Sequence, residues 1–302
     1  MKPAAFAYYR PDHLDEALAL LADHEDAKPL AGGQSLIPAM NFRLAAPAAL
    51  IDLNHITALA GAQASDTGGL QLGAMTRHAA LERSPLVAER APLLAETMPF
   101  IAHPQIRSRG TLGGSLAHAD PAAELPAVMV ALEATLTLRS ASGERRLPAE
   151  QFFTGLFATA LEPGELLTAI ELPAPTARRG TAFLELARRH GDYALVGVAV
   201  TLTLDESNRC RAARIALLSV GDGPTLARRA AAALAGEELT DQAIRAAAEL
   251  AAGEDVDPPS DLHASAAYRR QLVRVLARRA LSLAAQRAYS SSSSSMRPAR
   301  EA

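Results

Sequence analysis

The segment Leu30-Ala31-Gly32-Gly33-Gln34-Ser35-Leu36 runs from a short apolar stretch through two adjacent glycines to a serine, a residue that often precedes a helix. Because glycine adopts positive φ angles freely, such a loop can bring its backbone close to a ligand. Successive N–H groups beside a helix N-terminus bind anions such as phosphate. The segment therefore predicts either an anion-binding loop or an ordinary strand–turn–helix junction, since short glycine motifs are common.

A second segment has the same ingredients further along the chain. Arg109-Gly110-Thr111-Leu112-Gly113-Gly114-Ser115 again pairs glycines with flanking hydroxyl groups, and Arg107 lies just upstream. A dinucleotide carries a diphosphate between two sugars, so two separate loops rich in N–H groups can hold it from both sides. Taken together, the two segments favour dinucleotide binding about as much as they favour two unrelated turns.

The residues that follow the second segment carry polar groups suited to a sugar. Asp120 and Glu124 can accept hydrogen bonds from hydroxyl groups, and His118 can donate one. The alternative for Asp120, which precedes Pro121, is a cap on the next helix. Further on, Tyr193 precedes an apolar run, where an aromatic ring either covers a planar ligand or lies half-buried at the start of a strand. Spacing alone favours the half-buried tyrosine.

Composition excludes several classes of protein. The chain has 302 residues, a formal net charge of −3 and 4% aromatic residues, which argues against a dedicated nucleic-acid binder. Its one cysteine, Cys210, excludes a disulfide framework, a zinc ribbon and an iron–sulfur cluster within this chain. The two lysines, Lys2 and Lys28, do not follow glycines, so no Gly-Lys-Ser/Thr phosphate loop is present. No secretory signal or membrane-spanning stretch is found, and we expect a cytoplasmic protein.

Hydrophobic periodicity predicts a mixed helix and sheet protein of the α+β class. In the first part, we expect helices at Leu14–Leu21, Ser35–Arg43, Thr76–Arg83, Pro85–Met98 and Pro126–Glu133, with Asp12, Ser35 and Thr76 as caps, and strands at Leu50–Leu53, Leu70–Ala74, Ala134–Arg139 and Leu166–Leu172. Residues 101–126 have no clean period and are typical of a long functional loop.

The composition changes after Leu172, where Pro173–Thr176 is typical of a linker. Beyond it we expect three antiparallel strands, at Thr181–Arg188, Val196–Leu204 and Arg211–Val220, followed by three helices, at Thr225–Ala235, Thr240–Ala252 and His263–Ala288. The run Ser290–Ser295 begins a low-complexity tail that we expect to be disordered.

Four motifs in this order resemble the FAD-binding medium subunits of molybdenum hydroxylases, the carbon monoxide dehydrogenase and xanthine dehydrogenase family. They are Leu30–Pro38, Arg107–Ser115, Asp120–Pro126 and Gly191–Ala194. The resemblance implies a two-lobed FAD-binding domain of the vanillyl-alcohol-oxidase type over residues 1–175, with the lobe boundary near residue 57. It further implies a C-terminal domain over residues 176–288, made of a three-stranded antiparallel sheet and a three-helix bundle, with the tail at 289–302 outside the family.

Carried over by position, the resemblance implies that the two glycine loops hold the diphosphate of a noncovalently bound FAD. His118, Asp120 and Glu124 would lie along the ribityl and flavin side, Leu167 near the adenine, and Ile101 and Tyr193 beside the isoalloxazine. The implied cofactor-binding residues are Leu30, Ala31, Gly32, Gly33, Gln34, Ser35, Leu36, Ile101, Gly110, Thr111, Leu112, Gly113, Gly114, Ser115, His118, Asp120, Glu124, Leu167 and Tyr193. Two positions depart from the family: Leu184-Glu185 stands where some members have a lysine, and Ile101 replaces an aromatic residue of xanthine dehydrogenases.

The resemblance implies an electron-transfer subunit with no catalytic acid or base and no metal of its own. A large subunit would carry the molybdenum cofactor and a small subunit two [2Fe–2S] clusters, in a dimer of heterotrimers. The flavin would pass electrons to a small-molecule acceptor: NAD⁺, a quinone or oxygen. Two alternatives stay open: a self-contained flavin oxidase acting on a small molecule, and a scaffold that kept the fold but lost FAD.

Overall fold

The fold divides into two units. The computed structural model describes the backbone of residues 1–294 and the side chains of residues 1–291. One unit comprises Met1–Asp120 and Glu133–Pro173, and the other comprises Pro121–Leu132 and the chain from Ala174 onward. The division after Pro173 lies two residues from the boundary expected from the sequence. The sequence did not indicate that residues 121–132 leave the first unit, because no linker composition marks either end of that segment.

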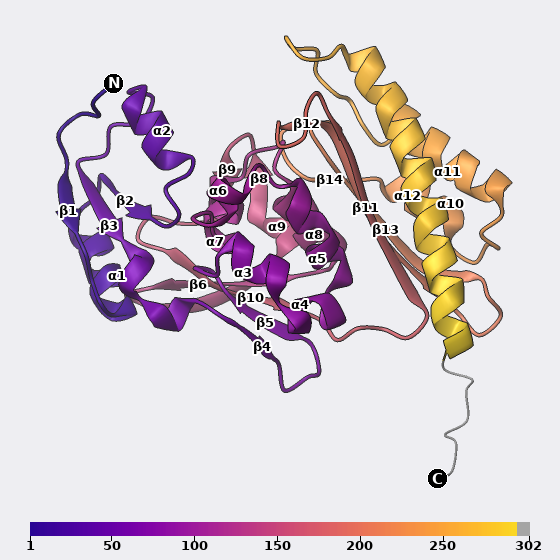
Figure 1. The fold of residues 1–302 in the computed structure, drawn as a ribbon, viewed down its shortest axis with the longest axis horizontal. Coiled ribbons are helices and arrows are strands. Elements are labelled where there is room, and N and C mark those ends of the chain that lie inside the picture. The colour runs from indigo at the N-terminus through magenta and orange to yellow at the C-terminus, as the bar shows by residue number, and fades with distance from the viewer. Residues whose placement is uncertain (295–302) are drawn as a thin grey trace. The chain divides into compact units, whose positions relative to one another are not determined.

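The N-terminal part of the first unit is a small parallel sheet. Its strands are β1 (Ala7–Tyr9), β2 (Ala27–Leu30) and β3 (Ala49–Asp52), in the order β1-β3-β2. Helix α1 (Leu14–Asp23) connects β1 to β2 and buries Ala17, Leu18 and Leu21, as its periodicity predicts. Its N-cap is His13 rather than the expected Asp12, whose backbone N–H donates to Glu16 Oε2 instead. Figure 1 shows this sheet with α1 and α2 beside it.

The parallel arrangement places two loops at one edge of this sheet. Leu30 at the end of β2 is paired with Asp52 at the end of β3. The first glycine loop therefore leaves the sheet beside the segment that follows Asp52, since parallel strands end at the same edge. Helix α2 (Leu36–Asn41) follows the loop, and Ser35 takes the N-cap position without the expected side-chain cap.

The rest of the first unit is built on an antiparallel sheet in the order β4-β5-β10-β6-β7. Its strands are β4 (Ala62–Ala64), β5 (Leu70–Gly73), β6 (Thr135–Ser140), β7 (Gly143–Pro148) and β10 (Leu166–Leu172). Strand β10 has the predicted bounds. The sequence missed β7, because this edge strand is charged and largely exposed and lacks an apolar alternation.

Short helices connect these strands, and two expectations were wrong here. The helix expected at Pro85–Met98 is broken at Pro92, whose missing N–H and ring prevent a continuous helix. The expected loop at 101–126 contains helices, which the sequence hid because two of them are very short or glycine-rich. The bounds are α3 (His78–Arg83), α4 (Pro85–Arg90), α5 (Pro92–Thr97), α6 (Pro104–Arg107), α7 (Leu112–His118) and α9 (Ala149–Phe152), with 3-10 turns η1 (Leu53–His55), η2 (Thr57–Leu59) and η3 (Met98–Phe100) and the hairpin β8 (Phe153–Gly155) and β9 (Ala158–Thr159).

The N-cap of α3 is Arg77 rather than the expected Thr76. The Thr76 hydroxyl donates instead to the carbonyl oxygens of Gly61 and Gly73. Thr76 thus ties Gly61, which precedes β4, and Gly73, which ends β5, to the start of α3. The sequence placed the helix cap one residue too early.

The second unit is an antiparallel sheet covered by helices. The three predicted strands are β11 (Arg179–Ala187), β12 (Ala194–Leu204) and β13 (Cys210–Leu218). A fourth strand, β14 (Thr225–Leu226), pairs with β13 at residues where the sequence predicted a helix, and α10 begins only at Arg228. The α+β class and the family fold are confirmed, with one short strand more than expected.

Both faces of the central strand β12 are covered, and all of its residues are buried. Val198, Val200 and Leu202 belong to the core shared with the helices. Thr201, which points to the opposite face because side chains alternate along a strand, donates to the carbonyl oxygen of Ala131 in α8 (Glu124–Ala131). This contact explains why α8 belongs to the second unit.

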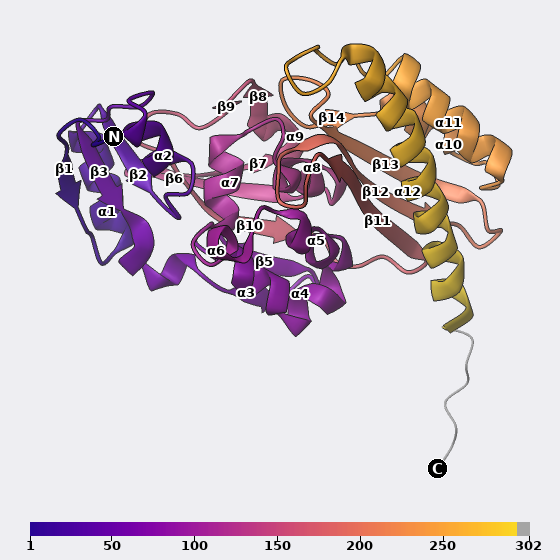
Figure 2. The same ribbon diagram turned by 45° about the horizontal axis from the view of Figure 1, so that its top comes forward.

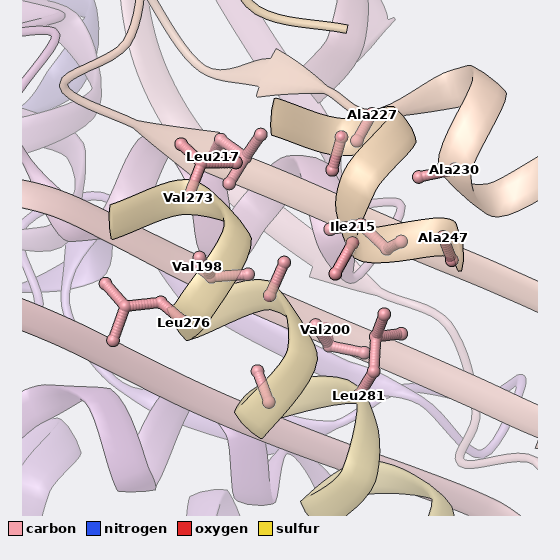
Figure 3. Packing of buried hydrophobic residues seen from close by; sticks show 14 of the residues in the cluster. Val198, Val200, Ile215, Leu217, Ala227, Ala230, Ala247, Val273, Leu276 and Leu281 are labelled. Carbon is pink, nitrogen blue, oxygen red and sulfur yellow. The ribbon is translucent and has the colours of Figure 1, made fainter. Parts of the chain in front are cut away.

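The helical layer of this unit comprises α10 (Arg228–Leu234), α11 (Asp241–Gly253) and α12 (Ala266–Ser294). These helices lie together along one side of the sheet (Figure 2). Figure 3 shows Val273, Leu276 and Leu281 of α12 packed toward Val198 and Val200 of β12. The close packing of small and branched residues fixes α12 on the sheet.

Helix α12 continues beyond the point where the sequence predicted a disordered tail at 289–302. The backbone is helical to Ser294, and the hydroxyl of Ser290 donates to the carbonyl oxygen of Gln286 one turn earlier. The low-complexity composition therefore did not show where the helix ends. Residues 295–302 of the expected tail lie outside the described residues. None of the helices in the described part of the chain is both long and apolar enough to cross a membrane.

Candidate functional site

The first glycine loop presents backbone N–H groups without acceptors in the protein. Within the described residues, no hydrogen-bond acceptor is found for the N–H groups of Gly32, Gly33, Gln34 and Ser35. Gly33 has a φ of +71°, a conformation that glycine adopts at little cost. Side-chain Nε2 of Gln34 donates to the Gly32 carbonyl oxygen at 3.0 Å, and Ile37 N donates to that of Gly33 at 3.1 Å. The loop is thus held by its carbonyls and leaves its donors available for an anion.

The second glycine loop differs, because most of its N–H groups already have partners. Leu112 N donates to Thr76 O at 3.0 Å, Gly113 N to Ala74 O at 2.7 Å, and Gly114 N to the Thr111 hydroxyl at 3.1 Å. The expectation that both loops offer the same array of free N–H groups is therefore wrong for these three residues. Their hydrogen bonds fix the start of α7 against β5 and the Thr76 turn instead.

The glycines of the second loop are required by the protein's own packing. A Cβ on Gly113 would lie 2.5 Å from Ala74 Cβ, and one on Gly110 would lie 2.9 Å from His78 Nδ1. The sequence left open whether these glycines belong to a ligand-binding loop or to a turn. The structure shows that here they allow close approach between segments of the chain.

The two loops, far apart in the sequence, are in direct contact. A Cβ on Gly32 would overlap the carbonyl oxygen of Arg109 and would lie 2.8 Å from Gly110 Cα. A Cβ on Gly114 would lie 3.3 Å from Ala31 Cβ. The structure therefore brings together the two groups of residues that the sequence analysis paired.

A polar network that the sequence analysis missed supports the first loop. Tyr8 donates its hydroxyl hydrogen to Asp52 Oδ2, and Asp52 Oδ1 accepts from both nitrogens of Asn54, the backbone bond being 2.9 Å. Burial by itself raises the pKa of Asp52, but the hydrogen bonds from Tyr8 and Asn54 outweigh it and hold that pKa below its usual value. Asn54 Nδ2 also donates to the Ala31 carbonyl oxygen at 3.0 Å.

Arg77 connects this network to the second loop. Its guanidinium donates to Asn54 Oδ1 and to the carbonyl oxygen of Arg109. Burial, followed by the neighbouring charge of Arg109, lowers the pKa of Arg77. Neither Asn54 nor Arg77 carries a sequence signal, because their roles depend on contacts between segments that are distant in the chain.

His78 lies beneath the second loop and is 5% exposed. Its backbone N–H donates to Gly110 O at 2.9 Å, whereas neither ring nitrogen has a hydrogen-bond partner within the described residues. The pKa of His78 is lowered to about 4, chiefly by burial; the backbone of Thr111 raises this pKa, and the charges of Arg107 and Arg77 lower it. The imidazole is therefore neutral at physiological pH.

The other predicted site residues occupy varied environments. Ile101 is buried, and its carbonyl accepts from Arg107 at 3.0 Å; Leu167 is buried in β10 opposite Leu138. His118 ends α7, with its ring 5.2 Å from that of Phe157. Asp120 is half-buried at the end of its segment of the first unit.

Two predicted site residues belong to the second unit. Glu124 starts α8 and is 7% exposed, whereas Tyr193 precedes β12 and is 68% exposed. Burial raises the pKa of the nearby Glu185 to about 8, and the negative charge of Glu124 adds to this effect. No hydrogen-bond partner for Glu185 Oε2 is found within the described residues. The Glu185 carboxyl group is therefore largely protonated at neutral pH.

A metal ion needs several ligating side chains gathered at one place. Groups of three or more His, Cys, Asp or Glu side chains that could hold an ion are absent from the described part of the chain. Cys210 is buried, and burial raises the pKa of its thiol to about 11, so it is neither a thiolate ligand nor a nucleophile at neutral pH.

Comparison with known proteins gives matches along almost the whole chain. Residues 4–175 match the family described as the FAD binding domain in molybdopterin dehydrogenase, and residues 181–284 match the CO dehydrogenase flavoprotein C-terminal domain. The chain is 44% identical to the 6-hydroxypseudooxynicotine dehydrogenase complex subunit alpha of Paenarthrobacter nicotinovorans, over 95% of this chain and 97% of that one. It is 42% identical to the carbon monoxide dehydrogenase medium chain of Afipia carboxidovorans, over 95% and 99% of the two chains.

Solved structures agree with these matches. Quinoline 2-oxidoreductase from Pseudomonas putida 86 superposes with a TM-score of 0.90 at 42% identity, covering 95% of this chain and 99% of that chain. Carbon monoxide dehydrogenase from Hydrogenophaga pseudoflava gives a TM-score of 0.91 at 41% identity, with the same coverage. These structures therefore share the fold of this chain over nearly its whole length.

Proposed function

Because this chain belongs to the family of FAD-binding medium subunits of molybdopterin dehydrogenases, as its motifs predicted, we propose that it is the FAD-carrying electron-transfer subunit of a molybdenum hydroxylase. The observation that carries the proposal is the first glycine loop, which packs against the second: within residues 1–294, no acceptor is found for the N–H groups of Gly32–Ser35. Adjacent N–H groups at the start of a helix suit a diphosphate. The residues present therefore fit the cofactor that the family implies.

In this proposal the chain binds and orients FAD and performs no acid–base chemistry of its own. When bound, FAD supplies reversible electron transfer, which is the chemistry of the cofactor rather than of the protein. The first loop holds the diphosphate through its N–H groups, and the second loop fixes the position of the first. The further contacts predicted from the resemblance, including His118, Leu167 and Tyr193, remain part of the proposal.

The partners follow from the single cysteine and from the relatives. One cysteine cannot ligate an iron–sulfur cluster, so in this proposal the clusters lie on another chain. Two relatives are named as a complex subunit and as a medium chain. We propose a large subunit with the molybdenum cofactor and a small subunit with two [2Fe–2S] clusters, from which this subunit passes electrons to a small-molecule acceptor, in a dimer of heterotrimers in the cytoplasm.

Cofactor binding is tested with the purified chain. Titration with FAD, followed by visible absorption and flavin fluorescence, should show about one FAD per chain. Gly32→Ala should abolish binding, because its Cβ would overlap the Arg109 carbonyl and separate the loops. Gly253→Ala is the matched control, since a Cβ there has no atom within 4 Å. A wild-type chain that binds no FAD would contradict the proposal and favour the scaffold alternative.

Partner binding needs a separate experiment. The chain, affinity-tagged in the organism that produces it, should co-purify with a cysteine-rich subunit and a molybdenum-containing subunit, detected by mass spectrometry and metal analysis. Recovery of the flavin-loaded chain alone, with oxidase activity on a small molecule, would instead support the self-contained flavin oxidase.

A further inference from the structure

We propose that Asn54 is a positioning residue for FAD: its side-chain amide holds the Ala31 carbonyl and thereby directs the Gly32 N–H toward the cofactor diphosphate. The inference rests on the proposed function and adds to it a residue outside both glycine loops. Asn54 lies in η1, directly after β3, at the sheet edge where the first loop also begins. It reaches that loop through its Nδ2 bond of 3.0 Å to Ala31 O.

The orientation of the Asn54 amide is fixed by its neighbours. Arg77 has only donors, so it must face the amide oxygen Oδ1. The ionised Asp52 carboxylate and the Ala31 carbonyl have only acceptors, so both must face the amide nitrogen Nδ2. Tyr8 donates to the other carboxylate oxygen of Asp52 and holds that group in place. Rotating the amide by 180° would break the contacts of the Asn54 side chain with Arg77, Asp52 and Ala31.

The geometry of the peptide group carries the effect of Asn54 into the loop. In a trans peptide, the carbonyl of one residue and the N–H of the next point in opposite directions. Because Asn54 holds the Ala31 carbonyl, the Gly32 N–H must point away from Asn54. Within the described residues that N–H has no acceptor, so it is left for a ligand. Gln34, by holding the Gly32 carbonyl at 3.0 Å, acts in the same way on the Gly33 N–H.

Arg77 extends this arrangement to the second loop. It donates both to Asn54 Oδ1 and to the Arg109 carbonyl, the oxygen against which Gly32 packs. One guanidinium therefore fixes the Asn54 amide and the backbone that faces Gly32. The donors of the first loop are oriented before FAD arrives, and preorganised donors bind an anion without the cost of ordering them.

The test compares FAD dissociation constants of variants that remove the Nδ2 donor. Asn54→Asp keeps the shape and an acceptor for Arg77, and Asn54→Ala removes the side chain without adding charge. We expect the FAD dissociation constant to rise about tenfold or more in both variants. This is the range for losing one hydrogen bond to a charged group, here the bond from the Gly32 N–H to the diphosphate. The matched control is Asn208→Asp, because Asn208 also accepts from an arginine, Arg178, but belongs to the second unit. The FAD dissociation constant of Asn208→Asp should stay within about twofold of the wild-type value.

A spectroscopic signature separates positioning from general destabilisation. With [¹⁵N]glycine labelling, the Gly32 amide resonance should shift on FAD addition in wild type and shift much less in the Asn54 variants. Arg77→Lys keeps the charge but loses the guanidinium group that donates to both Asn54 Oδ1 and the Arg109 carbonyl, and it should also reduce this shift. If the Asn54 variants do not fold, the Gly32 amide shift is measured in Arg77→Lys instead. Urea unfolding of each variant without FAD shows whether it is folded.

The outcomes distinguish this inference from the proposed function. If wild type binds FAD and the folded Asn54 variants bind it equally tightly with an unchanged Gly32 shift, the positioning role is overturned. If wild type binds no FAD, the proposed function fails, and the positioning role fails with it.

Discussion

The neutral state of His78 predicts a specific loss of stability in acid. The pKa of a histidine is ordinarily about 6.5, and burial lowers that of His78 to about 4. In the unfolded chain, His78 takes up a proton near pH 6.5, whereas in the folded chain it stays neutral down to about pH 4. Stability that is fully present above pH 6.5 must fall as the pH drops from 6.5 to 4.

The magnitude follows from the difference between the two pKa values. At about 1.4 kcal/mol per pH unit, 6.5 against about 4 corresponds to roughly 3 kcal/mol of unfolding free energy. His78 is 5% exposed, so little solvent screening reduces this value. A loss of that size is a large fraction of the stability of a typical domain.

Urea unfolding followed by circular dichroism, at pH values from 7 to 4.5, measures this loss. His78→Gln has no imidazole to titrate, so the unfolding free energy should fall less steeply with acid than in wild type. The control is His13→Gln, at an exposed position, which should follow the wild-type curve. Parallel curves for wild type and His78→Gln would refute the buried, neutral state of this histidine.

Three further variants test other parts of the structure. Wild type should lose stability as the pH rises from about 4.5 to about 8, because over that range the folded state favours the protonated Glu185 carboxyl more than the unfolded state does. Glu185→Gln, which cannot titrate, should show a smaller loss, measured by thermal unfolding from pH 5 to 9. An unchanged loss in the variant would count against a neutral Glu185. Gly180→Ala should prevent α12 from packing on β11, since its Cβ would overlap Ala284 O and lie 2.6 Å from Ala288 N; a normal melting temperature would contradict that packing. Leu281→Ala should lower the unfolding free energy by about 2–5 kcal/mol, as measured in urea, because Leu281 is fully buried; a loss under about 1 kcal/mol would argue against the core shown in Figure 3.

The elements that the sequence predicted well are those whose own residues determine their burial. Strand β10 was found at its true bounds, since its residues are largely apolar and buried. Strand β7 was missed because its charged side chains lie at an exposed sheet edge. Helix α7 was missed because two glycines near its start weaken helical propensity, although Thr111 caps it.

In the candidate site, too, features set by local sequence were predicted, whereas features set by contacts between distant segments were not. The paired glycines and their family could be identified from the sequence, because such motifs are local. The different states of the two loops could not, since the N–H groups of Leu112 and Gly113 find their acceptors at Thr76 and Ala74, on another segment. The role of Asn54 likewise depends on a parallel strand pairing that places it beside Ala31.

The central claim is that the first glycine loop holds the diphosphate of FAD. A crystal structure of the FAD-saturated chain tests it most directly. The account predicts diphosphate oxygens within hydrogen-bond distance of the N–H groups of Gly32, Gly33, Gln34 and Ser35, with Asn54 still bonded to the Ala31 carbonyl. Density for FAD at another place on the chain, with these four N–H groups facing only solvent, would contradict it.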